Sequence, residues 1–308
     1  MDKVIWAVDP FAKDNRIQLA ALKALENLTE STKATIEPVA ILSPDQLRLP
    51  KNTFDDHSKH YETKAEAIIK GWVKKLKSKR LTSPTLLVQD IYSTHITVDV
   101  LLRYAQETGA SLIAVGTHNK KGLQRFFLGS FAETLILKST TPVLIVNPKC
   151  PVKKKVSHIL FPTDFSQTSK KAFEKLLVQA KALKARITLY FKFEYLMPET
   201  VEAIKLLPDY SKFQEADLKS KEALGEEWTK LAKSKGVKAD IILDQKGIFI
   251  PDGILRTVKK GKIDMIAMAS HSGAVSSALI GSVARHVVRS ATVPVWVIHP
   301  DSKKNLRN

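Results

Sequence analysis

Short apolar runs alternate along the chain with longer segments whose apolar residues recur every three to four positions. In the first half, the apolar runs predict strands at residues 4–8, 35–42, 85–89, 112–115 and 143–146. The segment after the first run carries a stripe at three-residue steps that predicts a helix: Leu19, Leu22, Leu25 and Leu28. Buried strands that alternate with amphipathic helices are typical of βαβ units around a parallel sheet.

The chain contains the same unit twice. Residues 129–148, GSFAETLILKSTTPVLIVNP, align with residues 281–300, GSVARHVVRSATVPVWVIHP, at an offset of 152 and with seven identities. Residues 112–119 align with residues 265–272 at an offset of 153, and an apolar run that ends in Asp9 or Asp164 opens each copy. A second helical stripe follows Asp164: Phe173, Leu176, Leu177, Ala180 and Leu183. We therefore expect five strands and four helices in each copy.

This duplication predicts an α/β protein of two doubly wound domains, each with a five-stranded parallel sheet. Residues 147–155, NPKCPVKKK, carry two prolines, a lysine run and little apolar content, a composition typical of a linker. We place the boundary near Pro151, so that domain 1 spans residues 1–150 and domain 2 spans residues 151–308. These ranges are called the first copy and the second copy below.

Composition limits the compartment and the partners. The 308 residues include 49 Lys or Arg and 31 Asp or Glu, and the net charge of +18 favours polyanions and phosphate-bearing ligands. The single cysteine, Cys150, excludes an intrachain disulfide and fits a reducing compartment. The N-terminal apolar run is too short for a signal peptide, and no run approaches the roughly 20 apolar residues of a membrane span. We expect a cytoplasmic protein with no membrane partner.

The segment from Gly116 to Ser130 is the strongest candidate for a ligand site. It begins where a buried strand ends and finishes where a helix begins, and ligands of open parallel sheets bind at that edge. Gly116 removes a side chain at the strand exit, and Gly129 and Ser130 open a helix whose free N–H groups can bind an anion. Three basic residues of the loop can reach phosphate oxygens: Lys120, Lys121 and Arg125. The pattern favours a nucleotide, while a purely structural role as turn and capping residues stays open.

These motifs resemble those of the universal stress protein family in its tandem form. The family signature is Gly, two residues, Gly, nine residues, Gly and then Ser or Thr, placed after the fourth strand, with an Asp at the end of the first. The first copy reads Gly116, two residues, Asn119, nine residues, Gly129 and Ser130. It departs from the signature only at Asn119, and Asn is the non-glycine residue that best tolerates positive φ.

The second copy departs further from the signature. It opens with FPTDFS at residues 161–166, which is typical of the family, and it keeps Gly281 and Ser282. However, it carries Ala269 and Ser272 in place of the first two glycines, and its loop is one residue shorter. These changes indicate that the second copy has lost or changed its nucleotide site.

The resemblance implies a Rossmann-like, adenine nucleotide alpha hydrolase-like fold and an ATP site. In the family, the strand-one acid lies near the sugar, the end of strand two borders the base, and the glycine segment wraps the phosphates. In the first copy this implicates Asp9, Val39 or Ala40, Val115, Gly116, His118, Asn119, Gly129 and Ser130. In the second copy it implicates Asp164, Met268, His271, Gly281 and Ser282. The resemblance also implies an intramolecular pseudo-dimer paired through residues 143–146 and 295–298, and it leaves a homodimer open.

No pairing of nucleophile and base and no known catalytic motif stands out in the sequence. We therefore expect a non-catalytic stress-response protein that binds ATP, with or without Mg²⁺, mainly in the first copy, and whose ligand state is read by a protein partner. One alternative is a protein-interaction scaffold with both nucleotide sites degenerate. Another is a nucleic-acid-binding protein, which the net charge suggests but which the lack of interleaved aromatic residues disfavours.

Two further patterns have simpler interpretations. Residues 55–60, DDHSKH, could hold a divalent metal, but a solvated loop that leads into a helix is favoured. Residues 64–80 predict a basic amphipathic helix that packs its apolar face on the sheet, rather than one that lies on a membrane or a nucleic acid.

Overall fold

The computed structural model describes residues 2–12, 14–47, 49–76, 78–90, 93–117, 129–147, 150, 155–193, 210–246, 249–270 and 281–299. The first copy contains β1 (Lys3–Val8), α1 (Arg16–Thr29), β2 (Thr35–Leu42), α2 (Pro44–Leu47), α3 (Lys51–Leu76), β3 (Thr85–Val88), α4 (Thr94–Glu107), β4 (Ile113–Gly116), α5 (Ser130–Lys138) and β5 (Val143–Val146). The second copy contains β6 (His158–Pro162), α6 (Gln167–Leu183), β7 (Arg186–Lys192), α8 (Tyr210–Ser234), β8 (Ala239–Asp244), α9 (Ile250–Lys260), β9 (Met265–Ala269), α10 (Ser282–Ser290) and β10 (Val295–Ile298).

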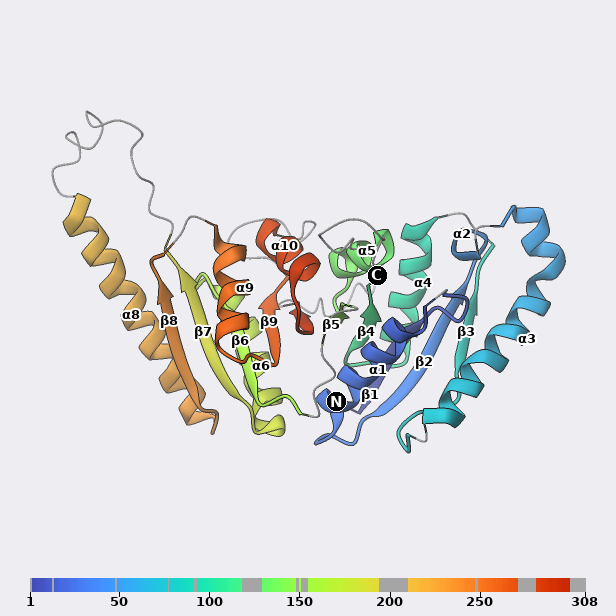
Figure 1. The fold of residues 1–308 in the computed structure, drawn as a ribbon, viewed down its shortest axis with the longest axis horizontal. Helices are drawn as coiled ribbons and strands as arrows, with labels where there is room; N and C mark the ends of the chain where they lie inside the picture. Colours follow the sequence, from blue (N-terminus) through green and yellow to red (C-terminus); the bar gives the residue numbers. More distant parts are fainter. Residues whose placement is uncertain are drawn as a thin grey trace, which may run out of the picture.

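The described strands form one ten-stranded sheet in the order β3-β2-β1-β4-β5-β10-β9-β6-β7-β8. Each half is parallel and doubly wound, as expected, and the two halves join where β10 pairs antiparallel with β5. The pairing of residues 143–146 with residues 295–298, which the resemblance implies, is confirmed, and it joins the two five-stranded sheets into one. The junction lies at the centre of the molecule, with α3 and α8 at opposite ends (Figure 1). Pairing of the last strands removes two sheet edges whose backbone groups would otherwise lack partners.

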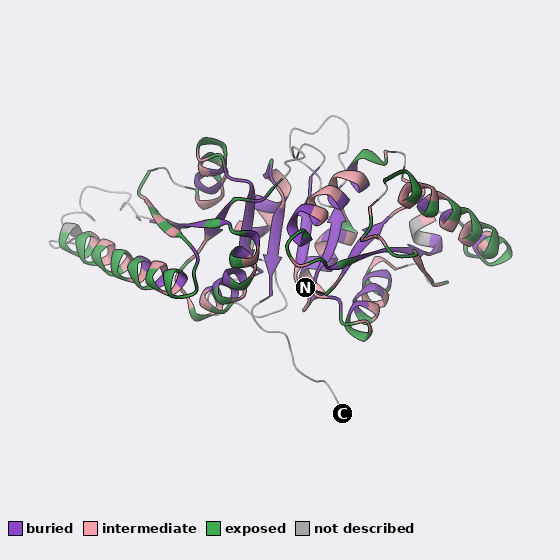
Figure 2. Cartoon of the chain, turned by 90° about the horizontal axis from the view of Figure 1, so that it is seen from below, coloured by how far each residue is buried: buried purple, intermediate pink, exposed green. Residues whose placement is uncertain are grey.

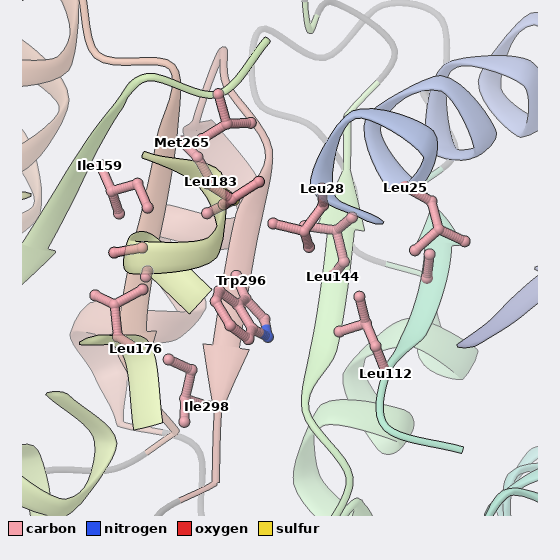
Figure 3. Packing of buried hydrophobic residues seen from close by; sticks show 14 of the residues in the cluster. Leu25, Leu28, Leu112, Leu144, Ile159, Leu176, Leu183, Met265, Trp296 and Ile298 are labelled. Atoms are coloured by element: carbon pink, nitrogen blue, oxygen red, sulfur yellow. The ribbon is translucent and has the colours of Figure 1, made fainter. Parts of the chain in front are cut away.

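Helices cover both faces of this sheet. One core cluster combines residues of α1, α3, α6 and α8 with one face, and the other combines residues of α4, α5, α9 and α10 with the opposite face. The central strands are buried, whereas α3 and α8 expose their outer sides (Figure 2). The first cluster continues across the junction, where Trp296 of β10 and Leu144 of β5 form a cross-strand pair (Figure 3). The two copies therefore share a core.

Most predicted elements are confirmed, but one boundary is wrong. The strands at 35–42 and 143–146 match β2 and β5, and the stripe after Asp164 is buried on α6. The predicted helix at 64–80 is the second part of α3, which begins at Lys51, so residues 55–60 lie on a helix and not in a loop. Ala65 and Ile69 of α3 are buried against the sheet, as its apolar periodicity predicts.

Several other features of the described residues bear on the expected chemistry. Within the described ranges, no three His, Cys, Asp or Glu side chains come close enough to hold a metal ion. None of the helices described is both long and apolar enough to cross a membrane. Cys150 is buried in the core, and burial raises the pKa of its thiol to about 12. The thiol is therefore protonated at neutral pH.

Candidate functional site

A pocket of about 90 Å³ opens at the carboxyl ends of β1, β2 and β4. It lies at the point where the chain turns from one side of β1 to the other, which is where open α/β sheets bind ligands. Its walls come from three strand ends and the first turns of two helices: Ala7, Val8, Asp9, Gln18, Val39, Ile41, Val115, Gly116, Thr117, Gly129, Phe131 and Ala132.

Five of the predicted first-copy residues line this pocket together: Asp9, Val39, Val115, Gly116 and Gly129. Of the other predicted first-copy residues, the two that the structure describes, Ala40 and Ser130, do not line it. Ala40 lies in the core cluster on the opposite face, because successive side chains of a strand alternate between faces, so of the alternatives Val39 and Ala40 it is Val39 that lines the pocket. Ser130 is the exposed first residue of α5 and is not among the lining residues. His118 and Asn119, together with Lys120, Lys121 and Arg125, lie outside the described residues.

The apolar wall of the pocket includes two residues that sequence reasoning missed. Ile41 lies two positions after Val39 on β2, so the same strand alternation could have identified it. Phe131 is on the first turn of α5, and only the packing of that helix brings it to the end of β2. Together with Val39 and Val115, these side chains offer an apolar surface suited to a planar ring.

The N-terminus of α5 opens into the same pocket. Its N-cap is Gly129, with φ −59° and ψ 151°, and no side chain caps the helix there. The first N–H groups of a helix have no acceptor within the helix, and the helix dipole favours an anion at this end. A Cβ on Gly129 would meet no atom within 4 Å, so the backbone is open to close approach. This end of the pocket can therefore bind an anionic group.

Asp9 supplies the charged side chain of the pocket. It follows β1, and its Oδ1 accepts a hydrogen bond from the backbone N–H of Phe11 at 3.0 Å. This local contact holds the turn after β1 and orients the carboxylate beside the ends of β2 and β4. A carboxylate in this position can accept hydrogen bonds from hydroxyl groups of a ligand.

Gly116, at the end of β4, also has a packing role. A Cβ on Gly116 would overlap Cγ2 of Ile17 and would lie 3.0 Å from the Ile17 carbonyl oxygen. Ile17 is on the first turn of α1, so Gly116 is needed for the close packing of α1 against β4. The missing side chain makes room for the helix, and Gly116 also lines the pocket.

The ladder registers identify the equivalent positions of the second copy. Ile5 of β1 pairs with Glu37 and Ile113, and Leu160 of β6 pairs with Thr188 and Ile266. Ile113 and Ile266 are also equivalent in the sequence repeat. Counting along the two second strands, Tyr190 stands at the position of Val39, and Lys192 stands at the position of Ile41.

In the second copy, larger side chains fill the place of this apolar wall. Tyr190 is only 1% exposed, and its hydroxyl donates a hydrogen bond to Oδ2 of Asp244 at 2.6 Å. Lys192 is buried as well, and its Nζ donates to the carbonyl oxygens of Phe193 at 3.1 Å and Asp244 at 3.3 Å. A Cβ on Gly253 of α9 would overlap the Tyr190 hydroxyl, so this helix is shaped to admit the ring.

The pKa shifts of Asp244 and Tyr190 favour the hydrogen bond between them. Burial acts to raise the pKa of Asp244, but the hydrogen bonds from Tyr190 and from the Lys246 N–H, with Lys192 and Arg256 nearby, hold it below its ordinary value. Burial, and then the hydrogen bond to Asp244, raise the pKa of Tyr190. The phenol is therefore neutral and donates to a carboxylate, which is the stronger kind of hydrogen bond.

Asp164, the acid that follows the first strand of the second copy, accepts hydrogen bonds from residues close to it in the sequence. Oδ1 of Asp164 accepts hydrogen bonds from the Ser166 N–H at 3.0 Å, the Ser166 hydroxyl at 2.7 Å and the Ser169 hydroxyl at 2.5 Å. Burial acts to raise the pKa of Asp164, but these hydrogen bonds outweigh it and lower the pKa. Asp164 thus stabilises the start of α6.

Three other predicted residues of the second copy lie within the described residues: Met268, Gly281 and Ser282. Met268 is buried in a core cluster, and Ser282 is the exposed first residue of α10. Gly281 is the N-cap of α10, and its N–H approaches the Ser270 carbonyl oxygen at 3.5 Å. His271 lies outside the described residues.

Comparison with known proteins places this architecture in a family. The sequence matches the profile of the Universal stress protein family over residues 1–147 and 155–299. The curated relative Universal stress protein MJ0577 of Methanocaldococcus jannaschii is 35% identical over 71 residues, which are 23% of this chain and 44% of that protein. The chain therefore matches less than half the length of that relative.

A solved structure shows the same fold. A universal stress protein from Archaeoglobus fulgidus covers 97% of this chain and 98% of its own, with 18% identity and a TM-score of 0.65. Another from that organism, in complex with dAMP, covers 46% of this chain and 97% of its own, with 16% identity and a TM-score of 0.35. The profile match spans both halves, so the chain belongs to the universal stress protein family.

Proposed function

We propose that the first copy binds an adenine nucleotide, with ATP as the principal candidate, and that the chain is a non-catalytic stress-response protein. The observation that carries the proposal is the α5 N-terminus, which opens without a side-chain cap into an apolar pocket beside Asp9. A nucleotide combines a planar base, a sugar with hydroxyl groups and an anionic chain. The pocket offers a matching surface for each of these three parts.

In this proposal the residues have distinct roles. The base packs against Val39 and Ile41, and the sugar hydroxyls donate to Asp9. The phosphates face the N–H groups at Gly129 and the Ser130 hydroxyl at the start of α5. The family resemblance favours the same placement. Mg²⁺ would accompany the phosphates, and the described residues provide no dedicated metal site.

A contact path favours a readout of the ligand state through the second copy. Thr117 lines the pocket, and its hydroxyl donates a hydrogen bond to Oδ1 of Asn147 at 2.5 Å. Nδ2 of Asn147 donates in turn to the carbonyl oxygens of Val288 at 3.1 Å and Ala291 at 2.7 Å, at the end of α10. We propose that a ligand contact with Thr117 changes this path and alters the surface that α10 presents to a protein partner.

Calorimetric titration of the full chain tests the proposal. Wild-type protein should bind Mg-ATP with a stoichiometry of one per chain. Val39→Tyr places the second copy's residue in the first copy's pocket, and it should weaken binding at least about 100-fold, or about 2.7 kcal/mol. Val39→Ile, which keeps an apolar side chain of similar size, is the matched control and should bind within a few-fold of wild type.

Melting curves without ligand establish whether each variant is folded. ATP with EDTA in place of Mg²⁺ shows whether the metal contributes. Lack of binding by folded wild-type protein at millimolar nucleotide would contradict the proposal and would favour an interaction scaffold instead. Equal affinities of the Val39→Tyr and wild-type proteins would place the ligand elsewhere.

A further inference from the structure

The two copies meet across a pseudo-two-fold axis. In the β5–β10 ladder, Leu144 pairs with Trp296, and these residues are equivalent in the sequence repeat. On either side, Val143 pairs with Val297, and Ile145 pairs with Val295, so equivalent positions exchange across this central pair. The axis therefore passes through Leu144 and Trp296. Residues near it face the equivalent residues of the other copy.

Charges near this axis are complementary. Glu133 of α5 and Arg285 of α10 are equivalent in the repeat, and Oε1 of Glu133 lies 3.0 Å from Nε of Arg285. Arg289, which is equivalent to Leu137, places its Nη2 3.3 Å from Oε2 of Glu133. One carboxylate of the first copy is thus held between two guanidinium groups of the second.

The same positions would oppose pairing of identical copies. Two first copies would bring Glu133 against a second Glu133, and two second copies would bring four arginine side chains together. Like charges that face each other across an interface disfavour association. Only the unlike pair places opposite charges together at this axis.

The side chains of Leu144 and Trp296 are complementary in size at the same axis. Trp296 and Leu144 are both buried in the core cluster that crosses the junction. In Figure 3, the Trp296 ring on β10 is drawn beside β5, which carries Leu144. Two tryptophans at the central pair would overfill this core, and two leucines would leave a void.

The remaining polar contacts across the junction are nearly symmetric. Asn147 donates to the Val288 carbonyl oxygen, and the equivalent His299 places Nε2 2.9 Å from the carbonyl oxygen of Ile136, which is equivalent to Val288. These contacts hold the ends of α10 and α5 in the same way. They support pairing in general, so discrimination between copies depends on charge and size.

We propose that Glu133, Arg285, Arg289 and the Leu144–Trp296 pair make this face specific for the opposite copy. The partner that it fits is the other half of the same chain, and it rejects a second copy of the same half. Pairing of two identical copies through this face is thereby disfavoured.

Charge exchange in the full chain tests the proposal. Glu133→Arg imitates the all-arginine pairing of two second copies, and Arg285→Glu with Arg289→Leu imitates the pairing of two first copies. At low salt each change should lower the melting midpoint by about 3–6 °C. Combining all three substitutions restores one opposite-charge pair and should recover at least half of that loss. At high salt the differences should shrink, because salt screens half-exposed charges.

Two further measurements complete this experiment. Glu227→Arg breaks the exposed pair with Lys170, 2.9 Å apart within the second copy, and this matched charge reversal should change the midpoint by less than about 1 °C. Leu144→Trp with Trp296→Leu should melt above Leu144→Trp alone. Additive losses in both combined variants would overturn the proposal.

Discussion

The two copies share a fold but differ at the same place on their second strands. Val39 and Ile41 form an open apolar wall in the first copy, while Tyr190 and Lys192 fill the equivalent place in the second. The ring and the ammonium group both have hydrogen-bond partners. The difference shows that the same strand positions can carry either an open apolar wall or larger, hydrogen-bonded side chains without loss of architecture.

The acids that follow the first strands of the two copies, Asp9 and Asp164, also differ in their surroundings. Asp9 lines a pocket and accepts a hydrogen bond from the Phe11 N–H in the turn after β1, whereas Asp164 accepts hydrogen bonds from Ser166 and Ser169 at the start of α6. A carboxylate that stabilises a helix start has less capacity left for a ligand. The second copy therefore uses these positions for stability.

The largest effect on stability is expected from removing the Tyr190 ring in the second copy. Tyr190→Val removes a buried ring and the donor to Asp244, and it should lower the free energy of unfolding by about 3–5 kcal/mol. Tyr190→Phe keeps the ring and loses only the hydroxyl, so its loss should be about 1–2 kcal/mol. Urea unfolding of both variants measures the difference. Equal losses would show that the ring does not fill this space as described.

A pair of glycine substitutions separates packing from ligand contact in the first copy. Gly116→Ala forces a Cβ against Ile17, and it should lower the free energy of unfolding by about 2–3 kcal/mol. Gly129→Ala meets no atom within 4 Å, so its loss should stay within about 1 kcal/mol, as for a changed N-cap. Urea unfolding without nucleotide measures both. If Gly129→Ala were the more destabilising of the two, the packing role of Gly116 would be wrong.

The amino-terminal ends of the first two strands differ between the copies as well. Glu37 is buried, lies 2.7 Å from Lys3 Nζ and accepts hydrogen bonds from Tyr104 and Thr85, both at 2.7 Å. In the second copy the equivalent Thr188 is 2.8 Å from Nε2 of His158, so the carboxylate is missing. Burial acts to raise the pKa of Glu37, but its partners hold the pKa below the ordinary value.

We predict that the Glu37 carboxylate makes the free energy of unfolding depend on pH, and that this dependence arises in the first copy. Because the folded-state pKa is lowered, the stabilisation by Glu37 is complete above the unfolded pKa of about 4.3 and is lost as the pH falls through the lower folded value. Glu37→Gln should cost about 1–2 kcal/mol at pH 7. The difference from wild type in urea unfolding should shrink at acidic pH. A difference that stays constant down to pH 2 would rule out this ionised network.

Much of the fold can be predicted from the sequence alone, because the burial of a strand or helix is recorded in its own local pattern of residues. Apolar periodicity records which face of each strand and helix is buried, so it predicts β2, β5 and the α6 stripe directly. The repeat and its glycine signature indicate the family and the strand ends at which Asp9, Val39 and Gly129 meet. Alternation along β2 would also have selected Ile41 over Ala40.

The tertiary structure decided what depends on contacts between distant elements. The packing role of Gly116 depends on the approach of Ile17, and the position of the Tyr190 hydroxyl depends on the space that Gly253 leaves. The Glu133–Arg285 contact likewise arises from packing across the junction, whereas the resemblance already implied the pairing of β5 with β10. Local patterns report burial along one element, whereas these features depend on which elements pack together, and that is set by the complete core.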